Sequence, residues 1–175
     1  IGMKDLVLDL QSNGGGYLQS AVALADELLQ KGEMIVYTDG RSTGRHDYYA
    51  TDADMKVGKI TVLVDGYTAS AAEIVSGAIQ DNDRGTIVGR RTFAKGLIQR
   101  PIDLPDGSMI RLTTAHYYTP TGRCIQKPYV KGQKEDYAHD IENRYKHGEF
   151  TSADSIHFAD SLKYQTIRKH RTVYG

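Results

Sequence analysis

The chain has 175 residues, with 22 Lys and Arg balanced by 22 Asp and Glu, a single Cys and no Trp. This is the length of one domain, and such a chain can bury a core without disulfides or a structural metal. A formal net charge of zero removes the usual electrostatic argument for binding nucleic acid or an anionic membrane surface.

The first residues of the chain predict a strand, a turn and a helix. Leu6–Leu10 is typical of a short buried strand, and Asn13 with the three glycines that follow it allows a tight turn. Apolar residues then recur at helical spacing over Leu18–Lys31, and Gly32 is the expected C-cap. Because an apolar strand begins so early, we expect the chain to be a fragment that starts inside a domain.

The next part of the chain predicts the same order again. Met34–Thr38 is strand-like, whereas the polar stretch Gly40–Lys56 predicts a surface loop. Ile60–Asp65 is rich in β-branched residues and predicts a strand, with a helix over Ala69–Asp81 and a strand over Thr86–Gly89 to follow. Repeated strand, turn and helix indicate α/β layers with crossover connections.

The last part of the chain has a different pattern. Ile102–Leu104 and Ser108–Thr114 flank a Pro-Asp-Gly turn signal and predict a hairpin. From Gln133 onward the sequence is charged and patchily helical, and a helix is expected from Ser152 to about Ile167. No apolar run approaches the ~20 residues of a membrane-spanning helix, and residues 1–5 lack the features of a secretory signal.

Ser70 is the candidate nucleophile, because it lies between alanines at a turn from a strand into a helix. Unpaired backbone N–H groups at a helix N-terminus favour the negative oxygen of a tetrahedral intermediate. The same position also suits a serine that only caps the helix. A metal site is not indicated, since the one Cys has no companion and no two His stand at i, i+4 spacing.

Two residues could serve as the base for this serine. His116 is one, but it lies in a strand-like segment where a polar side chain is more often exposed to solvent. Lys95 lies in an apolar, glycine-bounded stretch after a strand, and a lysine can act as a base where burial disfavours its ammonium form. Spacing alone does not show that Lys95 is buried.

Five segments together resemble the C-terminal processing peptidases, also called tail-specific proteases, which are serine peptidases with a Ser–Lys dyad. They span about residues 6–128, and the order of the segments and the step of 25 residues from Ser70 to Lys95 are those of the family. The matching segments are Leu8–Gly16, Thr68–Glu73, Gln80–Asn82, Val88–Gln99 and Tyr117–Arg123.

The resemblance implies a role for each matching residue. Ser70 would be the nucleophile, Lys95 the general base and Gln99 the residue that helps to hold the lysine. The oxyanion hole would consist of backbone amides, namely that of Ala71 and a glycine amide of the first turn. Gly16 is the expected glycine and Gly15 the second choice, and no cofactor is implied.

Two further positions bear on this assignment. The family sometimes counts an acidic residue matching Asp81 with the catalytic group, but eleven residues of helix place it ~16 Å from Ser70. We therefore expect Asp81 to support the helix end. Ala94 stands where the family has glycine, and a positive φ there would affect the approach of Lys95.

For the fold, the resemblance implies an α/β sandwich of ββα units like that of ClpP and the crotonases, with an added hairpin and a helical C-terminal segment. Residues 1–175 would form a single, partial peptidase catalytic domain without the family's N-terminal region and PDZ domain. We expect such a chain to be weakly active or inactive alone. The family's location implies an exported, cell-envelope or periplasmic protein.

The implied substrates are proteins or peptides with apolar C-terminal tails. Assembly into a homo-oligomer is neither indicated nor excluded by the sequence. Two alternatives remain. A crotonase-type acyl-CoA enzyme would need acidic catalytic residues beside a CoA pocket, and the Ser70 to Lys95 spacing does not support it. A noncatalytic relative would bind a peptide or an apolar ligand in the same cleft, and intact Ser70, Lys95 and Gln99 argue against that reading.

Overall fold

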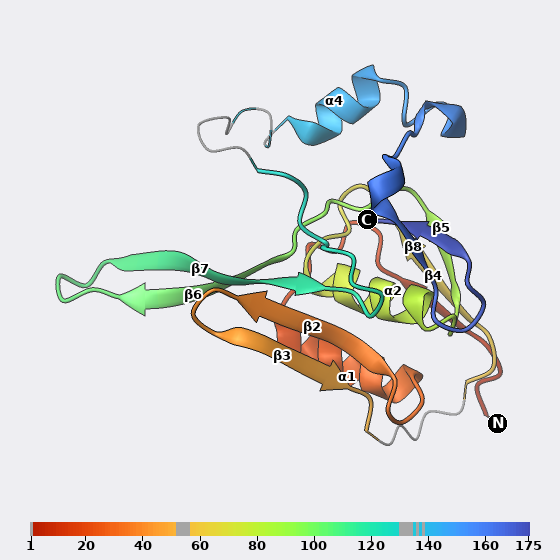
Figure 1. The fold of residues 1–175 in the computed structure, drawn as a ribbon, viewed down its shortest axis with the longest axis horizontal. Coiled ribbons are helices and arrows are strands. Elements are labelled where there is room, and N and C mark those ends of the chain that lie inside the picture. The colour runs from red at the N-terminus through yellow and green to blue at the C-terminus, as the bar shows by residue number, and fades with distance from the viewer. Residues whose placement is uncertain (1, 52–56, 130–134, 136, 138) are drawn as a thin grey trace.

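Strands from distant parts of the chain assemble into three sheets around two helices in a computed structural model that describes residues 2–51, 57–129, 135, 137 and 139–175 (Figure 1). In chain order the elements are β1 (Leu6–Asp9), α1 (Leu18–Leu28), β2 (Met34–Gly40), β3 (Gly44–Tyr49), β4 (Ile60–Val64), α2 (Ala71–Asp81), β5 (Thr86–Gly89), β6 (Leu97–Asp103), β7 (Met109–Tyr118), α4 (Asp140–Lys146), the 3-10 turns Ala153–Ser155 and Asp160–Leu162, β8 (Lys163–Gln165) and β9 (Thr172–Tyr174).

The first sheet is parallel, with the order β1-β4-β5. Its central strand β4 alternates buried and half-buried residues, and its β-branched side chains fill both faces. Leu8 pairs with Val62 and Val62 pairs with Ile87, so the three strands run in register. Parallel strands end at the same edge of a sheet, so the loops after β1, β4 and β5 are neighbours.

The second sheet is antiparallel, with the order β3-β2-β7-β6. Its β6–β7 hairpin projects from the body of the molecule (Figure 1). The hairpin turn contains Gly107 at φ 82°, a conformation that glycine adopts without strain, and the Leu104 N–H donates to the Ser108 carbonyl at 2.8 Å. The predicted hairpin is confirmed, but its strands are longer than the sequence pattern indicated.

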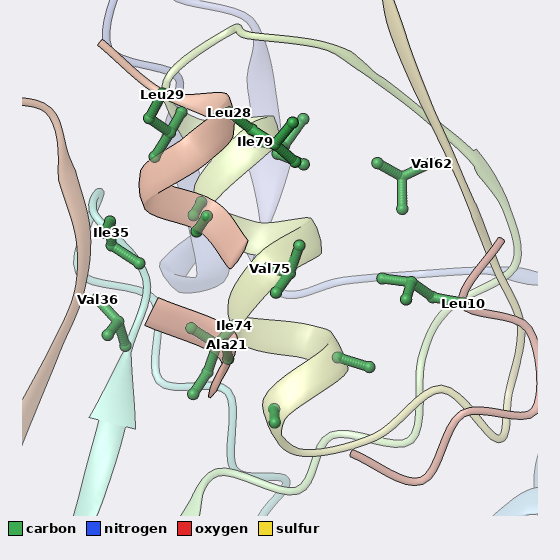
Figure 2. Packing of buried hydrophobic residues seen from close by; sticks show 14 of the residues in the cluster. Leu10, Ala21, Leu28, Leu29, Ile35, Val36, Val62, Ile74, Val75 and Ile79 are labelled. Carbon is green, nitrogen blue, oxygen red and sulfur yellow. The ribbon is translucent and has the colours of Figure 1, made fainter. Parts of the chain in front are cut away.

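Helices α1 and α2 pack against each other and against strands of both main sheets. Ala25 and Ala78 are fully buried, and their small side chains let the two helices approach closely. Figure 2 shows Ile74, Val75 and Ile79 of α2 among the buried apolar side chains. Fully burying one such side chain contributes about 1.5 to 3 kcal/mol. Among the described residues, no helix is long and apolar enough to cross a membrane.

The expected surface loop over Gly40–Lys56 is wrong in part, since β3 occupies Gly44–Tyr49 and pairs with β2. Most residues of β3 are exposed because it is an edge strand, so it has no apolar alternation. Residues 52–56 of that expected loop lie outside the described residues. The first helix ends at Leu28, before the predicted Lys31, and Gly32 lies in the turn that leads to β2.

The expected helix from Ser152 to Ile167 is also wrong. The segment forms two 3-10 turns and then β8, which pairs with β9. Ser152 does cap, but it caps a turn of only three residues. Strand pairing and the hydrogen bond from the Ile167 N–H to the Asp81 carbonyl, at 2.8 Å, override the local helix signal. The described α-helical part of the C-terminal region beyond residue 138 is α4 instead.

Candidate active site

Ser70 lies in the turn between the carboxyl end of β4 and the first residue of α2. Its backbone has φ 58° and ψ −121°, a conformation that costs an L residue on the order of 1 to 3 kcal/mol. Strained strand-to-helix turns of this kind expose the hydroxyl of a nucleophilic serine. The half-buried Ser70 side chain lines a cleft of about 620 Å³.

The serine turn is held by Asp65, which directly follows β4. Its carboxylate accepts three backbone N–H groups, among them those of Ser12 and Thr68 at 3.0 Å each. Burial raises the pKa of this carboxyl, but the N–H donors oppose burial and hold the pKa below its usual value overall. The Thr68 hydroxyl donates to the Leu10 carbonyl at 2.7 Å. Asp65 and Thr68 therefore join the serine turn to the end of β1.

The glycine-rich loop after β1 lies directly against Ser70. Gly15 has φ 93°, and a Cβ built on it would lie 2.7 Å from the Ser70 Cβ and 2.7 Å from the Ala71 nitrogen. The Ala69 N–H also donates to the Asn13 carbonyl at 2.9 Å, which fixes the two loops together. Only glycine fits at position 15 without displacing the serine turn.

The residues expected to form the oxyanion hole differ in whether their backbone N–H groups already donate a hydrogen bond. Across the described part of the chain, the backbone N–H groups of Ala71 and Gly16 have no hydrogen-bond acceptor, and both residues line the cleft beside Ser70. The Gly15 N–H instead donates to the Asn13 side-chain oxygen at 2.9 Å. Gly16 is therefore the glycine with a free donor, and Gly15 provides the close approach.

Lys95 lies in the loop between β5 and β6, at the same edge of the parallel sheet. The Phe93 N–H donates to the Thr68 carbonyl at 2.9 Å, so the loop is fixed to the serine turn. Lys95 is half-buried and lines the cleft together with Ser70. Ala94 has φ 67°, so this position does take the left-handed backbone that glycine adopts more easily.

The side chains expected to form the dyad share a cleft but are not paired. No hydrogen bond between the Lys95 amine and the Ser70 hydroxyl is found among the described residues. Gln99 is an exposed residue of β6 on the same cleft, and within the described ranges its amide does not bond to Lys95. His116 lies next to Tyr117, which contacts Ser70, and adjacent strand residues face opposite ways, so His116 faces away from the serine.

Glu73 is a site residue that the sequence reasoning did not assign, although it belongs to the matching segment around Ser70. It is only 4% exposed, and its carboxylate accepts four hydrogen bonds. Two come from the backbone N–H groups of Ser70 and Lys95, both at 2.8 Å. Burial raises the pKa of the Glu73 carboxyl, and its hydrogen bonds oppose that rise only in part.

Tyr117 of β7 is a second residue that the sequence reasoning left without a role. Its hydroxyl lies 3.0 Å from the Ser70 Oγ and also donates to the carbonyl of Lys95. Since a carbonyl only accepts and a phenol has one proton, the Ser70 hydroxyl is left to donate to the phenol oxygen. Burial raises the pKa of Tyr117 well above its usual value, so the phenol keeps its proton.

Asp81 lies at the far end of α2 and holds the segment that follows β7. Its fully buried carboxylate accepts the Thr121 N–H at 3.1 Å, the Thr121 hydroxyl at 2.7 Å and an N–H of Arg123 at 2.5 Å. The expected supporting role of Asp81 agrees with these contacts. Its partners belong to the matching Tyr117–Arg123 segment, so Asp81 joins that segment to the end of α2.

The site therefore combines a strained serine at a helix N-terminus, two free backbone N–H donors and an amine in one cleft. These are the groups that acyl transfer through a serine requires. Among the described residues, no three His, Cys, Asp or Glu side chains are grouped so that they could hold a metal ion. The fold and the site are those of a candidate serine hydrolase.

Comparison with known proteins gives the family. The sequence profile of peptidase family S41 matches residues 1–138, and the chain belongs to that family. The chain is 47% identical over 130 residues to a carboxy-terminal-processing protease of Bartonella bacilliformis, covering 71% of this chain and 29% of that protein. It is 43% identical over 128 residues to a chloroplastic C-terminal processing peptidase of Tetradesmus obliquus, covering 72% of this chain and 27% of that protein.

The solved structures agree with the sequence comparison. A photosystem II D1 C-terminal processing protease matches 70% of this chain and 32% of its own, with 42% identity and a TM-score of 0.61. The α/β fold class and the resemblance to C-terminal processing peptidases are thus confirmed. The chain spans about a third or less of the length of these relatives, which come from bacteria and chloroplasts.

Proposed function

We propose that the chain is the catalytic part of a serine endopeptidase that cleaves proteins near their C-termini. Family membership and the names of the relatives support this class of activity. The observation that carries the proposal is the strained backbone of Ser70 beside the free N–H groups of Ala71 and Gly16. The substrates would be proteins with apolar C-terminal tails, and the enzyme would be exported or lie in the cell envelope or periplasm.

The proposed reaction is acyl transfer in two steps. The neutral Lys95 amine takes the Ser70 proton as the Ser70 Oγ attacks the peptide carbonyl, and the proton then passes to the leaving amine. Water, deprotonated by the same amine, then attacks the ester. The Lys95 ammonium returns this proton to the Ser70 Oγ as the new C-terminus leaves. The N–H groups of Ala71 and Gly16 would stabilise the oxyanion in both steps.

In this mechanism Ser70 must exchange one partner for another. The hydroxyl contacts Tyr117 in the observed arrangement, and Lys95 lies in the same cleft without a bond to it. A rotation about the serine Cα–Cβ bond, with the long lysine side chain moving, would bring the two groups together. Gln99, which also lines the cleft, would then hold the amine.

The test is cleavage of an unfolded reporter with a free apolar C-terminal tail. Activity would be compared between this chain and a form extended to the length of the relatives. Three single variants of the extended form, Ser70→Ala, Lys95→Ala and His116→Ala, would be measured beside it. We expect the first two variants to lose at least about a thousandfold in kcat and His116→Ala to keep it. Activity retained in Lys95→Ala would overturn the dyad, and a folded protein that binds the tail without cleaving it would favour the noncatalytic reading.

A further inference from the structure

Glu73 is a buried carboxylate whose contacts are all hydrogen donors. Its Oε2 accepts the backbone N–H groups of Ser70 and Lys95 at 2.8 Å each, and its Oε1 accepts the Thr92 hydroxyl at 2.6 Å and the Ala94 N–H at 2.7 Å. Within the described residues it forms no ion pair. A carboxylate that caps a helix needs only the first of these four bonds.

One oxygen of Glu73 joins the two loops, and the other holds the lysine loop alone. A single atom, Oε2, lies between the backbone of the proposed nucleophile and that of the proposed base, which are 25 residues apart in the sequence. The other atom, Oε1, accepts hydrogen bonds from Thr92 and Ala94, which precede Lys95 in the same loop. A change in the position of this carboxylate would therefore shift Ser70 and Lys95 relative to each other.

The strained residues of the site are bonded to the same carboxylate. Ser70 has φ 58° and Ala94 has φ 67°, both unfavourable for residues with a side chain. Such conformations persist only where the surroundings stabilise them, and the N–H group of each is bound by Glu73. Burying an anion without a cation is itself costly, so the four hydrogen bonds must offset that cost.

We propose that Glu73 is a positioning residue, whose ionised carboxylate sets the distance between Ser70 and Lys95 by holding both backbones. This inference rests on the proposed function for its effect on catalysis, and on the structure alone for its effect on the two loops. Within the described residues, the Glu73 carboxylate bonds neither the Ser70 hydroxyl nor the Lys95 amine, so it would act through the backbones of these two residues.

The main test is Glu73→Gln, which keeps the shape but replaces one acceptor oxygen by an NH2 donor. Either the Ser70 and Lys95 N–H groups or the Thr92 hydroxyl and the Ala94 N–H then lose their acceptor. In both cases the lysine loop loses bonds to residue 73. In the form extended to the length of the relatives, we expect kcat for the reporter to fall about a hundredfold, with KM changed less than about twofold. The control is Glu27→Gln, the same change at an exposed position of α1, which should leave both constants as they are.

Hydrogen exchange of the backbone amides gives a readout that does not depend on activity. In Glu73→Gln, the amides of Ser70, Ala94 and Lys95 should exchange at least about tenfold faster, while those of the α2 interior stay protected. If exchange is faster in Glu73→Gln but the separate Ser70→Ala variant still cleaves the reporter, the proposed function fails while the positioning of the loops by Glu73 holds. Unchanged exchange and unchanged kcat in Glu73→Gln would overturn the proposal.

A second variant keeps the test decisive if Glu73→Gln does not fold. Thr92→Val leaves the carboxylate in place and removes one of its four donors with little change in shape. We expect kcat to fall up to about tenfold, the effect of one lost hydrogen bond, and the Ala94 and Lys95 amides to exchange faster. Wild-type values of both kcat and exchange in Thr92→Val would contradict the role assigned to Glu73.

Discussion

Gly14, Gly15 and Gly16 follow one another in the sequence, yet their surroundings differ. A Cβ on Gly15 would come within 2.6 Å of the Ala69 carbonyl oxygen, whereas a Cβ on Gly14 or Gly16 would meet no atom within 4 Å. Gly15 therefore allows the close approach of the loop to the serine turn. Gly16 has an N–H group without an acceptor among the described residues, and its lack of a side chain is not what the loop needs.

We expect Gly15→Ala to lower kcat at least about a hundredfold, because a shift of about 1 Å at the serine turn misplaces the reacting groups. Gly14→Ala is the matched control at the neighbouring position and should stay within about twofold of the wild type. Cleavage of the tailed reporter measures both. Equal loss in the two variants would show that the close approach of Gly15 is not what the loop requires.

Tyr117 belongs to a distant strand but contacts both residues of the proposed dyad. Tyr117→Phe removes its contact with the Ser70 hydroxyl and leaves the Lys95 carbonyl without its phenol donor. We expect the free energy of unfolding in urea to fall by about 1 to 3 kcal/mol, the cost of an unsatisfied buried polar group. The matched control is Tyr145→Phe on α4, an exposed tyrosine, which should unfold like the wild type.

The sequence allowed Ser70, Lys95 and Gln99 to be proposed, but it did not indicate Glu73 and Tyr117, which contact the serine and the lysine loop. Ser70 and Lys95 belong to motifs with a recognisable spacing, and each motif follows a strand. The parallel pairing of these strands brings the two loops to one edge of the sheet. The partners of Glu73 are mostly backbone N–H groups, which every residue has, so no side-chain pattern indicates them. Tyr117 was not predicted for another reason. The alternation of residues along β7 predicts on which face of the sheet its side chain lies, but not which residues that face contacts.

At the scale of elements, the strands and helices with an apolar period were predictable and the others were not. β4 and α2 lie in the core, and their burial follows the pattern of their own residues. β3 is polar and exists because β2 offers it an edge. The segment that forms β8 has local helix signals, but it pairs with β9 in a short hairpin. The Ile167 N–H that follows it donates to the Asp81 carbonyl, a long-range contact that a local pattern does not contain.

Helix α4 lies beyond the matched residues 1–138 and supports the lysine loop. Its Arg144 is buried, and the guanidinium donates to the carbonyls of Arg91 and Thr92 at 2.6 and 3.1 Å and to the Glu149 carboxylate at 2.8 Å. Burial raises the pKa of Glu149, but the two arginines beside it oppose burial and hold the pKa below its usual value.

We expect Arg144→Ala to lower the free energy of unfolding by about 1 to 3 kcal/mol, since two carbonyls lose this donor while Glu149 keeps its pair with Arg91. The support for Lys95 is lost as well, so kcat should fall. Lys146→Ala, on the same helix, removes only an exposed pair with Glu142 and is the control. Urea unfolding and reporter cleavage test both, and an Arg144→Ala protein as stable and active as Lys146→Ala would contradict this role for α4.

At the scale of the whole molecule, the loops of the site meet because three parallel strands end at one edge of a sheet. The opposite end of α2 is where the chain's last strands attach. There the Asp83 carboxylate, with no exposed surface, accepts the N–H groups of Arg168 and Lys169 at 3.0 and 2.8 Å and the Arg171 guanidinium at 2.7 Å. α2 thus has the candidate site at one end and the C-terminal segment at the other.

The attachment of the C-terminal segment should depend on pH. Burial raises the pKa of Asp83, but its hydrogen bonds to the 166–171 loop oppose burial and leave the pKa below its usual value. A carboxyl with a lowered pKa in the folded state adds stability that is present above the unfolded value of about 3.9 and is lost as the pH falls through the folded pKa. The ionised form is therefore the one that holds the loop.

Asp83→Asn should lower the free energy of unfolding by about 2 kcal/mol at pH 7, because one amide oxygen replaces two charged acceptors. The difference from the wild type should shrink as the pH falls below about 4, because the carboxyl is then protonated first in the unfolded state and, at lower pH, in the folded state. Urea unfolding at pH 7 and pH 3 measures it, with Asp160→Asn, a change in an exposed surface pair, as the control. A difference that is the same at both pH values would mean that the shape of the Asp83 side chain, and not its charge, holds the C-terminal strands.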